Sequence, residues 1–325
     1  MKIYYHDDLD GKCAASVVCN YYRHNFPPAD ISPDDFIRIN YDNAFSFATV
    51  DNGEPVWFVD LSFDEKNATL IKTCLIDTGS EVTWIDHHRT SIQTQELPGF
   101  EWLKDVPGLR CSHDTFKKDG AKVNFSGAAL TYLYCALLKY PPDLREQMMN
   151  GTAMYDHNLL PDYIKYVSDY DCWAFNYDPK TTFFKLGMET TPSDPSASKW
   201  ILLDEDKEYV DYVITTGQAI KDYIDTSNDE LREECAYETT IDGHTCITIN
   251  RASNSWIFGS LYDRYPLCMV WYFNGEKYKF SLFSNCGTVD CSEIAKSYGG
   301  GGHKGAAGFY LDEMPFLRTG EPIKT

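Results

Sequence analysis

Four groups of Asp and His residues stand out in the first half of this 325-residue chain. They are the run His6-Asp7-Asp8-Leu9-Asp10-Gly11, the single Asp60, the triplet Asp86-His87-His88, and the run Asp169-Tyr170-Asp171-Cys172-Trp173. Carboxylates gathered at one place repel one another and shift one another's pKa values. Divalent cations remove that cost, so the four groups predict a metal centre. Oxygen and nitrogen donors without a thiolate favour Mn²⁺, with Mg²⁺, Co²⁺ or Fe²⁺ as alternatives.

The chemistry expected of such a centre is hydrolysis of a phosphoester. Two divalent ions about 3.5–4 Å apart can activate a water molecule and stabilise the oxygens of an in-line attack on phosphorus. Each group alone also has an ordinary structural explanation. Asp8 and Asp10 could cap a following helix, and Asp60 and Asp86 could cap the elements that follow their strands. Their joint occurrence favours the metal centre.

The elements around these groups are expected to form an α/β fold, a parallel sheet with helices on both faces. Compact apolar runs predict three strands, over 2–5, 56–59 and 82–85. Residues at helix-face spacing predict helices over 12–25, 64–78 and 126–140. Each strand runs directly into one of the first three groups. Ligands of parallel sheets bind beyond the carboxyl ends of the strands, so the groups fall where a site is expected.

The second half of the chain predicts a smaller, mixed α/β domain. The segment 190–203 begins with a stretch rich in Thr, Ser and Pro, which is typical of a linker. The expected division is therefore a catalytic domain over 1–189, a linker over 190–203 and a C-terminal domain over 204–325. In the last of these, the patterns predict a charged helix near 204–234, three strands near 245–250, 268–273 and 277–284, and a short helix over 292–298.

The composition restricts the partners. The net charge is −20, from 29 Lys and Arg against 49 Asp and Glu. Long nucleic acids are bound mainly through Lys and Arg, so the charge argues against a long nucleic acid and against an acidic membrane. The sequence contains no apolar run long enough to cross a bilayer and does not begin like a signal peptide. Its 11 Cys include no CxxC pair and are expected to be buried, reduced thiols of a cytoplasmic protein.

With these motifs in this order, the chain resembles the DHH phosphoesterase superfamily, named for the triplet found here as Asp86-His87-His88. The resemblance covers most of the chain, because the run GGGGHKGAAG over 299–308 is similar to the signature of the DHH-associated C-terminal domain. The opening HDDLDG and the run DYDCW resemble the branch of oligoribonucleases (nano-RNases) and cyclic-nucleotide phosphodiesterases.

The resemblance implies two overlapping sets of metal ligands. One set is His6, Asp8 and Asp60; the other is Asp10, Asp60, His87 and Asp171. His88 would contact the substrate phosphate, and Asp86 would act by orienting a neighbouring ligand. Asp169 is the alternative to Asp171, which is preferred because it directly precedes a small residue and Trp.

The resemblance also implies a mobile C-terminal cap domain that binds the nucleotide end. The substrate-binding residues expected there are Arg251, Ser284, Gly300, Gly301, Gly302, His303 and Lys304. Glycines let backbone N–H groups approach phosphate oxygens closely, although this run could also be a turn before a strand. Phe283 stands where the family often has an Arg before a Ser. Arg251 could replace that Arg, or Phe283 could stack on a base.

The function expected is therefore hydrolysis of very short nucleotide substrates by two divalent ions, preferably Mn²⁺. The candidates are di- to tetranucleotides, linear dinucleotides such as pApA, and cyclic nucleotides. A same-chemistry alternative is a pyrophosphatase or polyphosphatase, which would need more clustered Lys and Arg. A non-catalytic nucleotide-binding sensor is the alternative from another class. The oligomeric state, including a homodimer, stays open.

Overall fold

The computed structural model of the chain describes residues 1–27, 31–40, 45–111, 117–118, 121–122, 125–149, 156–192, 194–285, 287 and 289–316. The chain divides into two compact units, Met1–Gln218 and Ala219–Thr325. The division falls inside the long helix α9 (Lys207–Cys235). The segment expected to be a linker lies in the first unit, where α8 (Lys199–Glu205) places Trp200 in the core. The first unit therefore extends further along the chain than the expected boundary.

The first unit contains a parallel sheet of four strands in the order β2-β1-β3-β4. The three predicted strands are β1 (Lys2–His6), β3 (Val56–Val59) and β4 (Val82–Ile85). The fourth, β2 (Phe36–Ile39), was not predicted; it is a partly exposed edge strand without a continuous apolar run. Parallel pairing aligns the carboxyl ends of β1, β3 and β4 at one edge of the sheet.

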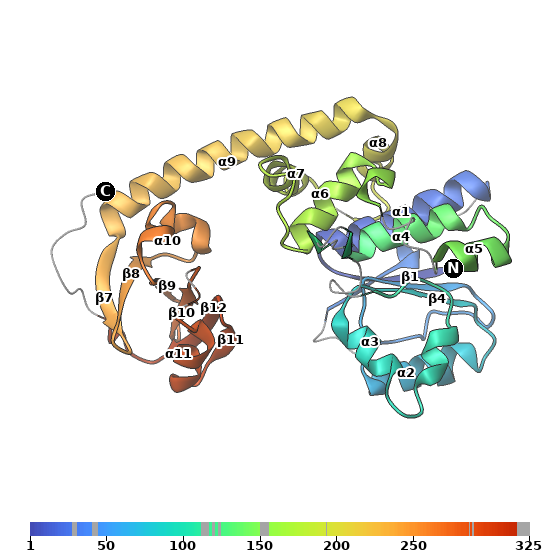
Figure 1. Cartoon of the computed structure of the whole chain (residues 1–325), viewed down its shortest axis with the longest axis horizontal. Coiled ribbons are helices and arrows are strands. Elements are labelled where there is room, and N and C mark those ends of the chain that lie inside the picture. Colours follow the sequence, from blue (N-terminus) through green and yellow to red (C-terminus); the bar gives the residue numbers. More distant parts are fainter. Residues whose placement is uncertain are drawn as a thin grey trace. The chain divides into compact units, whose positions relative to one another are not determined.

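Helices cover both faces of this sheet, which confirms the expected fold class (Figure 1). On one face, α1 (Leu9–Asn25) and α4 (Gly127–Leu137) share a core with Ile3 and Tyr5 of β1. On the other face, α2 (Glu65–Ile71) belongs to a second core that contains Tyr4. Successive residues of a strand point to opposite faces, so one short strand contributes to both cores.

The remaining elements of the first unit surround these layers. The helices are α3 (Arg89–Gln95), α5 (Pro142–Met149), α6 (Asp162–Asp171) and α7 (Lys180–Met188). A π-helical segment covers Lys72–Ile76, and 3-10 turns cover Pro33–Asp35, Glu101–Asp105 and His157–Leu159. The short strands β5 (Lys117–Lys118) and β6 (Ala121–Lys122) pair with each other. No described helix is both long and apolar enough to span a bilayer.

The second unit contains a mixed sheet of six strands in the order β11-β12-β10-β9-β8-β7. The strands are β7 (Tyr237–Ile241), β8 (His244–Asn250), β9 (Leu267–Phe273), β10 (Tyr278–Phe283), β11 (Gly301–His303) and β12 (Ala306–Leu311). The pairing of β8 with β9 is parallel and the other pairings are antiparallel. The helices α10 (Leu261–Arg264) and α11 (Cys291–Ser297) and a 3-10 turn, Ser255–Phe258, complete the unit.

The described cysteines differ in part from the expectation. None of them forms a disulfide, and most are buried. Cys74, however, is exposed, and Cys172 and Cys235 are partly exposed. Cys74 lies in the π-helical segment Lys72–Ile76, in which only Leu75 is buried. Its position on that segment therefore directs it to the surface.

Candidate metal centre

The parallel sheet places three of the predicted groups next to one another. His6 is the last residue of β1, Asp60 directly follows β3, and Asp86 directly follows β4. Since β1 pairs with β3 and β3 pairs with β4, these three strand ends are neighbours. The remaining ligand candidates come from the helices α1 and α6, which begin or end beside this edge.

Asp60 lies at the centre of the cluster. Its side chain is 1% exposed. One carboxylate oxygen, Oδ2, is 3.8 Å from His6 Nδ1, and the other, Oδ1, is 3.2 Å from His87 Nε2. Its backbone has a φ of 56°, a left-handed conformation that Asp tolerates better than most residues. Asp60 thus turns its two oxygens toward two different histidines.

The first predicted ligand set is close enough to hold one ion. His6 Nδ1 is 2.7 Å from Asp8 Oδ2. Single donor atoms of His6, Asp8 and Asp60 all lie within 4.8 Å of one another. Asp8 also caps α1, because its Oδ1 accepts a hydrogen bond of 2.9 Å from the backbone N–H of Gly11. The cap fixes Asp8 while leaving Oδ2 facing His6.

The second predicted ligand set gathers around His87. Its Nε2 is 3.2 Å from Asp60 Oδ1, 3.4 Å from Asp171 Oδ2 and 4.0 Å from Asp10 Oδ2. Cys172 also lies within the donor group of His87 and Asp171. Burial, followed by the nearby carboxylates, raises the pKa of the Cys172 thiol and so disfavours, in the metal-free protein, the thiolate form that binds metals.

The carboxylates of the cluster fit divalent cations. Asp60 Oδ1 and Oδ2, Asp10 Oδ2 and Asp171 Oδ2 are buried, and within the described part of the chain they accept no hydrogen bond. Buried polar atoms normally have a partner. Burial, followed by the neighbouring carboxylates, raises the pKa of Asp60 and of Asp171 well above the ordinary range and the pKa of Asp10 to about 6. Divalent ions would satisfy these oxygens and remove the repulsion.

The start of α4 holds Asp10 in place. The backbone N–H of Ala128 donates a hydrogen bond of 3.1 Å to Asp10 Oδ1. A Cβ on Gly127 would lie 2.6 Å from Asp60 Cβ and 3.0 Å from Asp10 Oδ2, so only glycine fits there. Ser126 caps the helix. Residues 126–128 were not among the predicted site residues, although Ser-Gly before an apolar helix is a visible signal in the sequence.

Asp86 and His88 form a hydrogen-bonded pair beside the cluster. His88 Nδ1 is 2.7 Å from Asp86 Oδ1 and 3.9 Å from Asp60 Oδ1. Ser91, also missed by the sequence analysis, donates a hydrogen bond to Asp86 Oδ2. Burial alone would raise the pKa of Asp86, but its hydrogen bonds with His88 and Ser91 and the charges of His88 and His87 together outweigh burial and lower that pKa. The same pair raises the pKa of His88 against the opposing effect of burial.

Asp169 lies outside the metal cluster. Its Oδ1 accepts hydrogen bonds from the backbone N–H and the side-chain amide of Asn176, at 2.8 and 3.2 Å. Its Oδ2 accepts hydrogen bonds from the backbone N–H of Tyr177 at 3.1 Å and from Thr181 Oγ1 at 2.5 Å. Both oxygens are therefore occupied by the loop after α6 and by the first turn of α7. Of the two alternatives, Asp171 is the one near His87.

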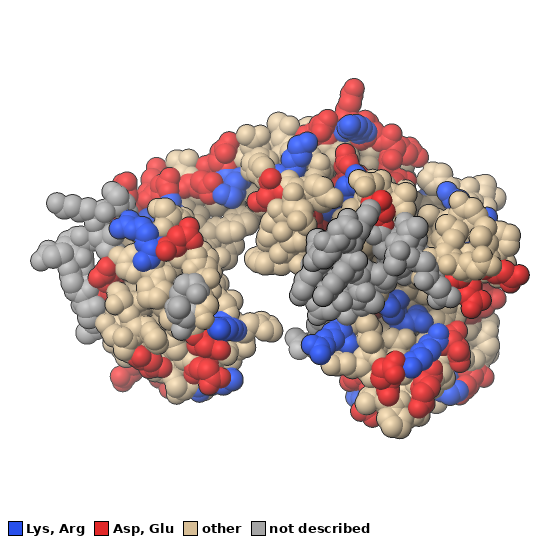
Figure 2. Space-filling model, in the orientation of Figure 1, with Lys and Arg blue, Asp and Glu red and all other residues tan. Residues whose placement is uncertain are grey.

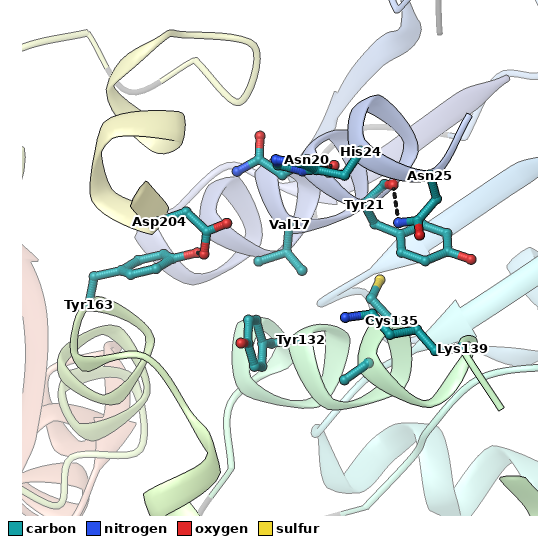
Figure 3. Close-up of a pocket in the computed structure, with 11 residues that line it drawn as sticks. Val17, Asn20, Tyr21, His24, Asn25, Tyr132, Cys135, Lys139, Tyr163 and Asp204 are labelled. Atoms are coloured by element: carbon teal, nitrogen blue, oxygen red, sulfur yellow. Dashed lines mark hydrogen bonds between the residues drawn. The ribbon is translucent and has the colours of Figure 1, made fainter. Parts of the chain in front are cut away.

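A cavity of about 500 Å³ opens beside the ligands. The carboxylates of Asp8, Asp10 and Asp171 line it together with Tyr170 and Trp173. A separate cavity of about 340 Å³, with Val17 and Tyr132 in its wall, lies between α1 and α4 (Figure 3). In that second cavity Tyr163 donates a hydrogen bond of 3.2 Å to Asp204. None of the metal-ligand groups found among the described residues lines it.

The substrate-binding residues predicted in the second unit are spread over three places. Arg251 is exposed and follows β8, whereas Ser284 is buried after β10 and its Oγ donates a hydrogen bond of 3.0 Å to the Pro266 carbonyl. Phe283 lies in β10, opposite Cys268 of β9 and Ala306 of β12. Its ring centroid is 6.3 Å from that of Phe258.

The glycine run forms an edge strand. Gly301–His303 make up β11, which pairs with β12, and His303 and Lys304 are exposed. A Cβ on Gly300 would overlap the Gly308 carbonyl oxygen, and one on Gly302 would lie 2.5 Å from Ala307 Cα. Close approach to β12 is therefore sufficient to explain these two glycines.

Among known proteins, this chain shows similarity to solved structures only. No protein-family model matches the sequence, and no curated protein is significantly similar to it. The DHH domain of a protein from a ribosomal-protein family is 11% identical, with a TM-score of 0.48, over 95% of this chain and 82% of that one. The pGpG-specific phosphodiesterase PggH from Vibrio cholerae is 14% identical, with a TM-score of 0.44, over 96% of this chain and 92% of that one.

A third likeness is to RecJ from Thermus thermophilus in complex with Mn²⁺. It is 15% identical, with a TM-score of 0.43, and covers 96% of this chain and 49% of that one. At these identities and TM-scores the likenesses say nothing of this chain's activity. It is in its sequence motifs that the chain resembles the DHH phosphoesterase superfamily.

Proposed function

We propose that the chain is a metal-dependent phosphodiesterase that hydrolyses very short nucleotide substrates. The observation that carries this proposal is the position of Asp60, whose two buried oxygens face His6 and His87. A carboxylate in this position suits a bridge between two cations. A lone structural ion would need only one of the two ligand sets.

The distances given above support the two ligand sets that the resemblance implies. His6, Asp8 and Asp60 would hold one ion, and Asp10, Asp60, His87 and Asp171 the other. When bound, such a pair of ions supplies an activated water and stabilises charge on the oxygens around phosphorus. We propose Mn²⁺ as the preferred ion because the donors are carboxylate oxygens and imidazole nitrogens.

In this proposal neither His88 nor Asp86 is a metal ligand: His88 contacts the substrate, and Asp86 orients His88. Asp86 holds His88 through Nδ1, which orients the imidazole and favours its protonated form. A protonated imidazole beside the cluster would donate to a phosphate oxygen as negative charge develops there. Asp86 is thus a positioning residue, and His88 a catalytic one.

The charges around the site favour a small phosphodiester over pyrophosphate. The cations that line the cavity are already paired: Lys12 Nζ is 2.9 Å from Asp7 Oδ1, and Lys185 Nζ is 2.7 Å from Glu189 Oε1. A compact anion with several charges would need cations that are available to it. A phosphodiester carries only one charge at its reacting group.

The proposal is tested by replacing Asp60 with Asn. Hydrolysis of pApA with Mn²⁺ should fall more than about 100-fold, because both ligand sets lose a charged oxygen. Bound manganese, measured by atomic absorption after gel filtration, should fall as well. The matched control is Asp51→Asn, an exposed Asp at the start of a turn in the same unit. Turnover of Asp60→Asn close to that of the control would contradict the mechanism.

Product chromatography separates the alternatives for the wild-type protein. It should be incubated with pApA, with a panel of short RNAs and cyclic nucleotides, and with pyrophosphate, each in the presence of Mn²⁺. Release of nucleoside monophosphate from the short nucleotides supports the proposal. Faster turnover of pyrophosphate than of every nucleotide would favour the pyrophosphatase, and tight nucleotide binding without turnover would favour the sensor.

A further inference from the structure

The cavity beside the metal centre has an aromatic wall that the proposed chemistry does not use. Trp173 lines this cavity together with the carboxylates of Asp8, Asp10 and Asp171. Its side chain is 69% exposed, although Trp is the largest of the apolar residues. Large apolar side chains exposed next to a polar site commonly mark a binding surface.

The backbone around Trp173 is strained. Trp173 has a φ of 54° and Phe175 a φ of 50°, both in the left-handed region that bulky residues rarely adopt. Such strain persists only where the surrounding structure imposes it, and it gathers at functional sites. The buried Asp169 anchors this loop, because its carboxylate accepts hydrogen bonds from Asn176 and Tyr177 in the loop and from Thr181 in α7.

The ring of Trp173 is supported by two aromatic neighbours. Its centroid is 4.9 Å from that of Phe175, with an angle of 79° between the planes, and 5.7 Å from that of Tyr170, with an angle of 64°. Both contacts are edge-to-face, so neither neighbour stacks flat on the indole. An exposed indole with its flat face uncovered by these neighbours, next to the ligand residues, is suited to stacking.

We infer that Trp173 is the surface on which a base of the substrate stacks while the adjoining phosphodiester lies at the metal centre. This inference rests on the proposed function, and it identifies the catalytic unit as a part of the chain that recognises the nucleoside. Every base has a π-face, so the stacking tolerates all four bases. Pyrophosphate and polyphosphate have no group that could use this surface.

Lys185 adds a cation to the same wall. Its Nζ is 5.4 Å from the centroid of the Tyr170 ring and 2.7 Å from Glu189 Oε1. The wall therefore combines an indole, a phenol ring and an ammonium group next to carboxylates that would hold metal ions. Because this ammonium group is already paired with Glu189, the wall offers aromatic faces rather than an available cation, and this suits a base better than a bare anion.

The test compares two phosphodiesters that differ in the base. One is pApA, and the other is the methyl ester of ribose 5-phosphate, a diester without a base. For Trp173→Ala, the ratio of the KM for pApA to the KM for the base-free diester should rise about 10- to 100-fold. Trp173→Phe, which keeps a π-face, should recover most of that loss. An unchanged ratio in Trp173→Ala would overturn the inference.

The matched control is Tyr212→Ala. Tyr212 is 63% exposed on α9, outside the cavity beside the metal centre. Its removal deletes an exposed aromatic ring of similar size and should leave the KM ratio at the wild-type value. A rise in the ratio as large as that of Trp173→Ala would also contradict the inference, because any exposed aromatic residue would then have the same effect.

A binding measurement separates this inference from the proposed function. AMP added to the protein with Mn²⁺ should quench tryptophan fluorescence in the wild type and in Tyr212→Ala, and should quench it far less in Trp173→Phe. If no diester is hydrolysed but this difference is found, the proposed function fails, and what stands of the inference is the stacking of a base on Trp173. If pApA is hydrolysed but AMP quenches the tryptophan fluorescence of the wild type and of Trp173→Phe equally, the inference alone fails.

Discussion

Asp169 and Asp171 show how a difference of two positions separates a structural carboxylate from a ligand. Both lie in the last turn of α6, and residues two apart do not share a helix face. Asp169 is directed into the loop after the helix, where four hydrogen bonds occupy it. Asp171 is directed toward His87.

The two residues should respond oppositely to the same substitution. Asp169→Asn puts an amide among four donors and should lower the free energy of unfolding by roughly 2–3 kcal/mol. Its Mn²⁺ affinity should change little at temperatures where the protein is folded. Asp171→Asn should weaken Mn²⁺ binding by more than about 10-fold without destabilising the metal-free protein. Urea titration and calorimetric titration with Mn²⁺ measure the two quantities, and an exchange of the two phenotypes would contradict the assignment.

The sequence predicted which residue types form the site, but not which side chains point toward it. The motif order identified six ligand candidates that the structure gathers around Asp60 and His87. It did not decide between Asp169 and Asp171, because the choice depends on how α6 packs. Ser91 was missed because a lone Ser has no signal in sequence; only its contact with Asp86 gives it a role.

The buried carboxylates also predict how the metal-free protein responds to pH. The pKa of Asp10 is raised to about 6, and those of Asp60 and Asp171 are raised further. The folded state therefore holds protons that the unfolded state releases above a pKa of about 4. Stability from these groups is present below that pH and is lost as pH rises through the folded pKa values.

In EDTA, the wild-type protein should therefore lose stability as pH rises from about 4 through about 6, the pKa of Asp10, at up to about 1.4 kcal/mol per pH unit for each such group. Excess Mn²⁺ should reduce that loss, since the ions replace the protons. Asp60→Asn should show a shallower decline in EDTA, because one acid and its repulsion are removed. Chemical unfolding at a series of pH values measures this. Equal slopes for the two proteins in EDTA would refute the electrostatic account.

At the scale of elements, the site depends on the approach of α4 to the strand ends. The N-terminus of α4 donates a hydrogen bond to Asp10, and Gly127 permits the close contact with Asp60.

The strands β1, β3 and β4 were predictable because their apolar runs are continuous. The edge strands β2 and β7 were missed, because their burial is incomplete and their sequences mix polar and apolar residues. The helix approach was not predictable, because it depends on atoms far apart in sequence.

Gly127→Ala tests that approach. The added methyl group should push α4 away from Asp60 and Asp10, lowering Mn²⁺ affinity and hydrolysis of pApA by more than about 10-fold. The matched control is Gly217→Ala, which would overlap the Phe183 carbonyl oxygen in the same unit but away from the ligands. Both variants should lose about 1–3 kcal/mol of stability. Both variants should be compared at a temperature where they are folded. An equal loss of Mn²⁺ affinity in the two would show that the loss is not specific to the contact of α4 with Asp60 and Asp10, and would contradict this prediction.

At the scale of the whole molecule, the net charge could be predicted from the sequence, but the boundary between the two units could not. The boundary between the units was not predictable, because α9 runs through it without a break in its helical pattern. The net charge of −20, in contrast, is read directly from the sequence. Figure 2 shows Asp and Glu side chains gathered along α9, with fewer Lys and Arg among them. A polyanion approaching such a surface is repelled.

This repulsion predicts how the length of an RNA substrate should affect its hydrolysis. Each additional phosphate adds repulsion from the protein, so kcat/KM for a 20-mer should be well below that for a dinucleotide in dilute buffer. Raising the salt from about 50 to 300 mM shortens the distance over which charges act. The kcat/KM for the 20-mer should therefore rise relative to that for the dinucleotide. Binding through a basic groove would give the opposite trend, since salt weakens contacts between Lys or Arg and phosphates. A fall in the relative kcat/KM of the 20-mer with salt would thus show that local cations, rather than the net charge, govern the encounter.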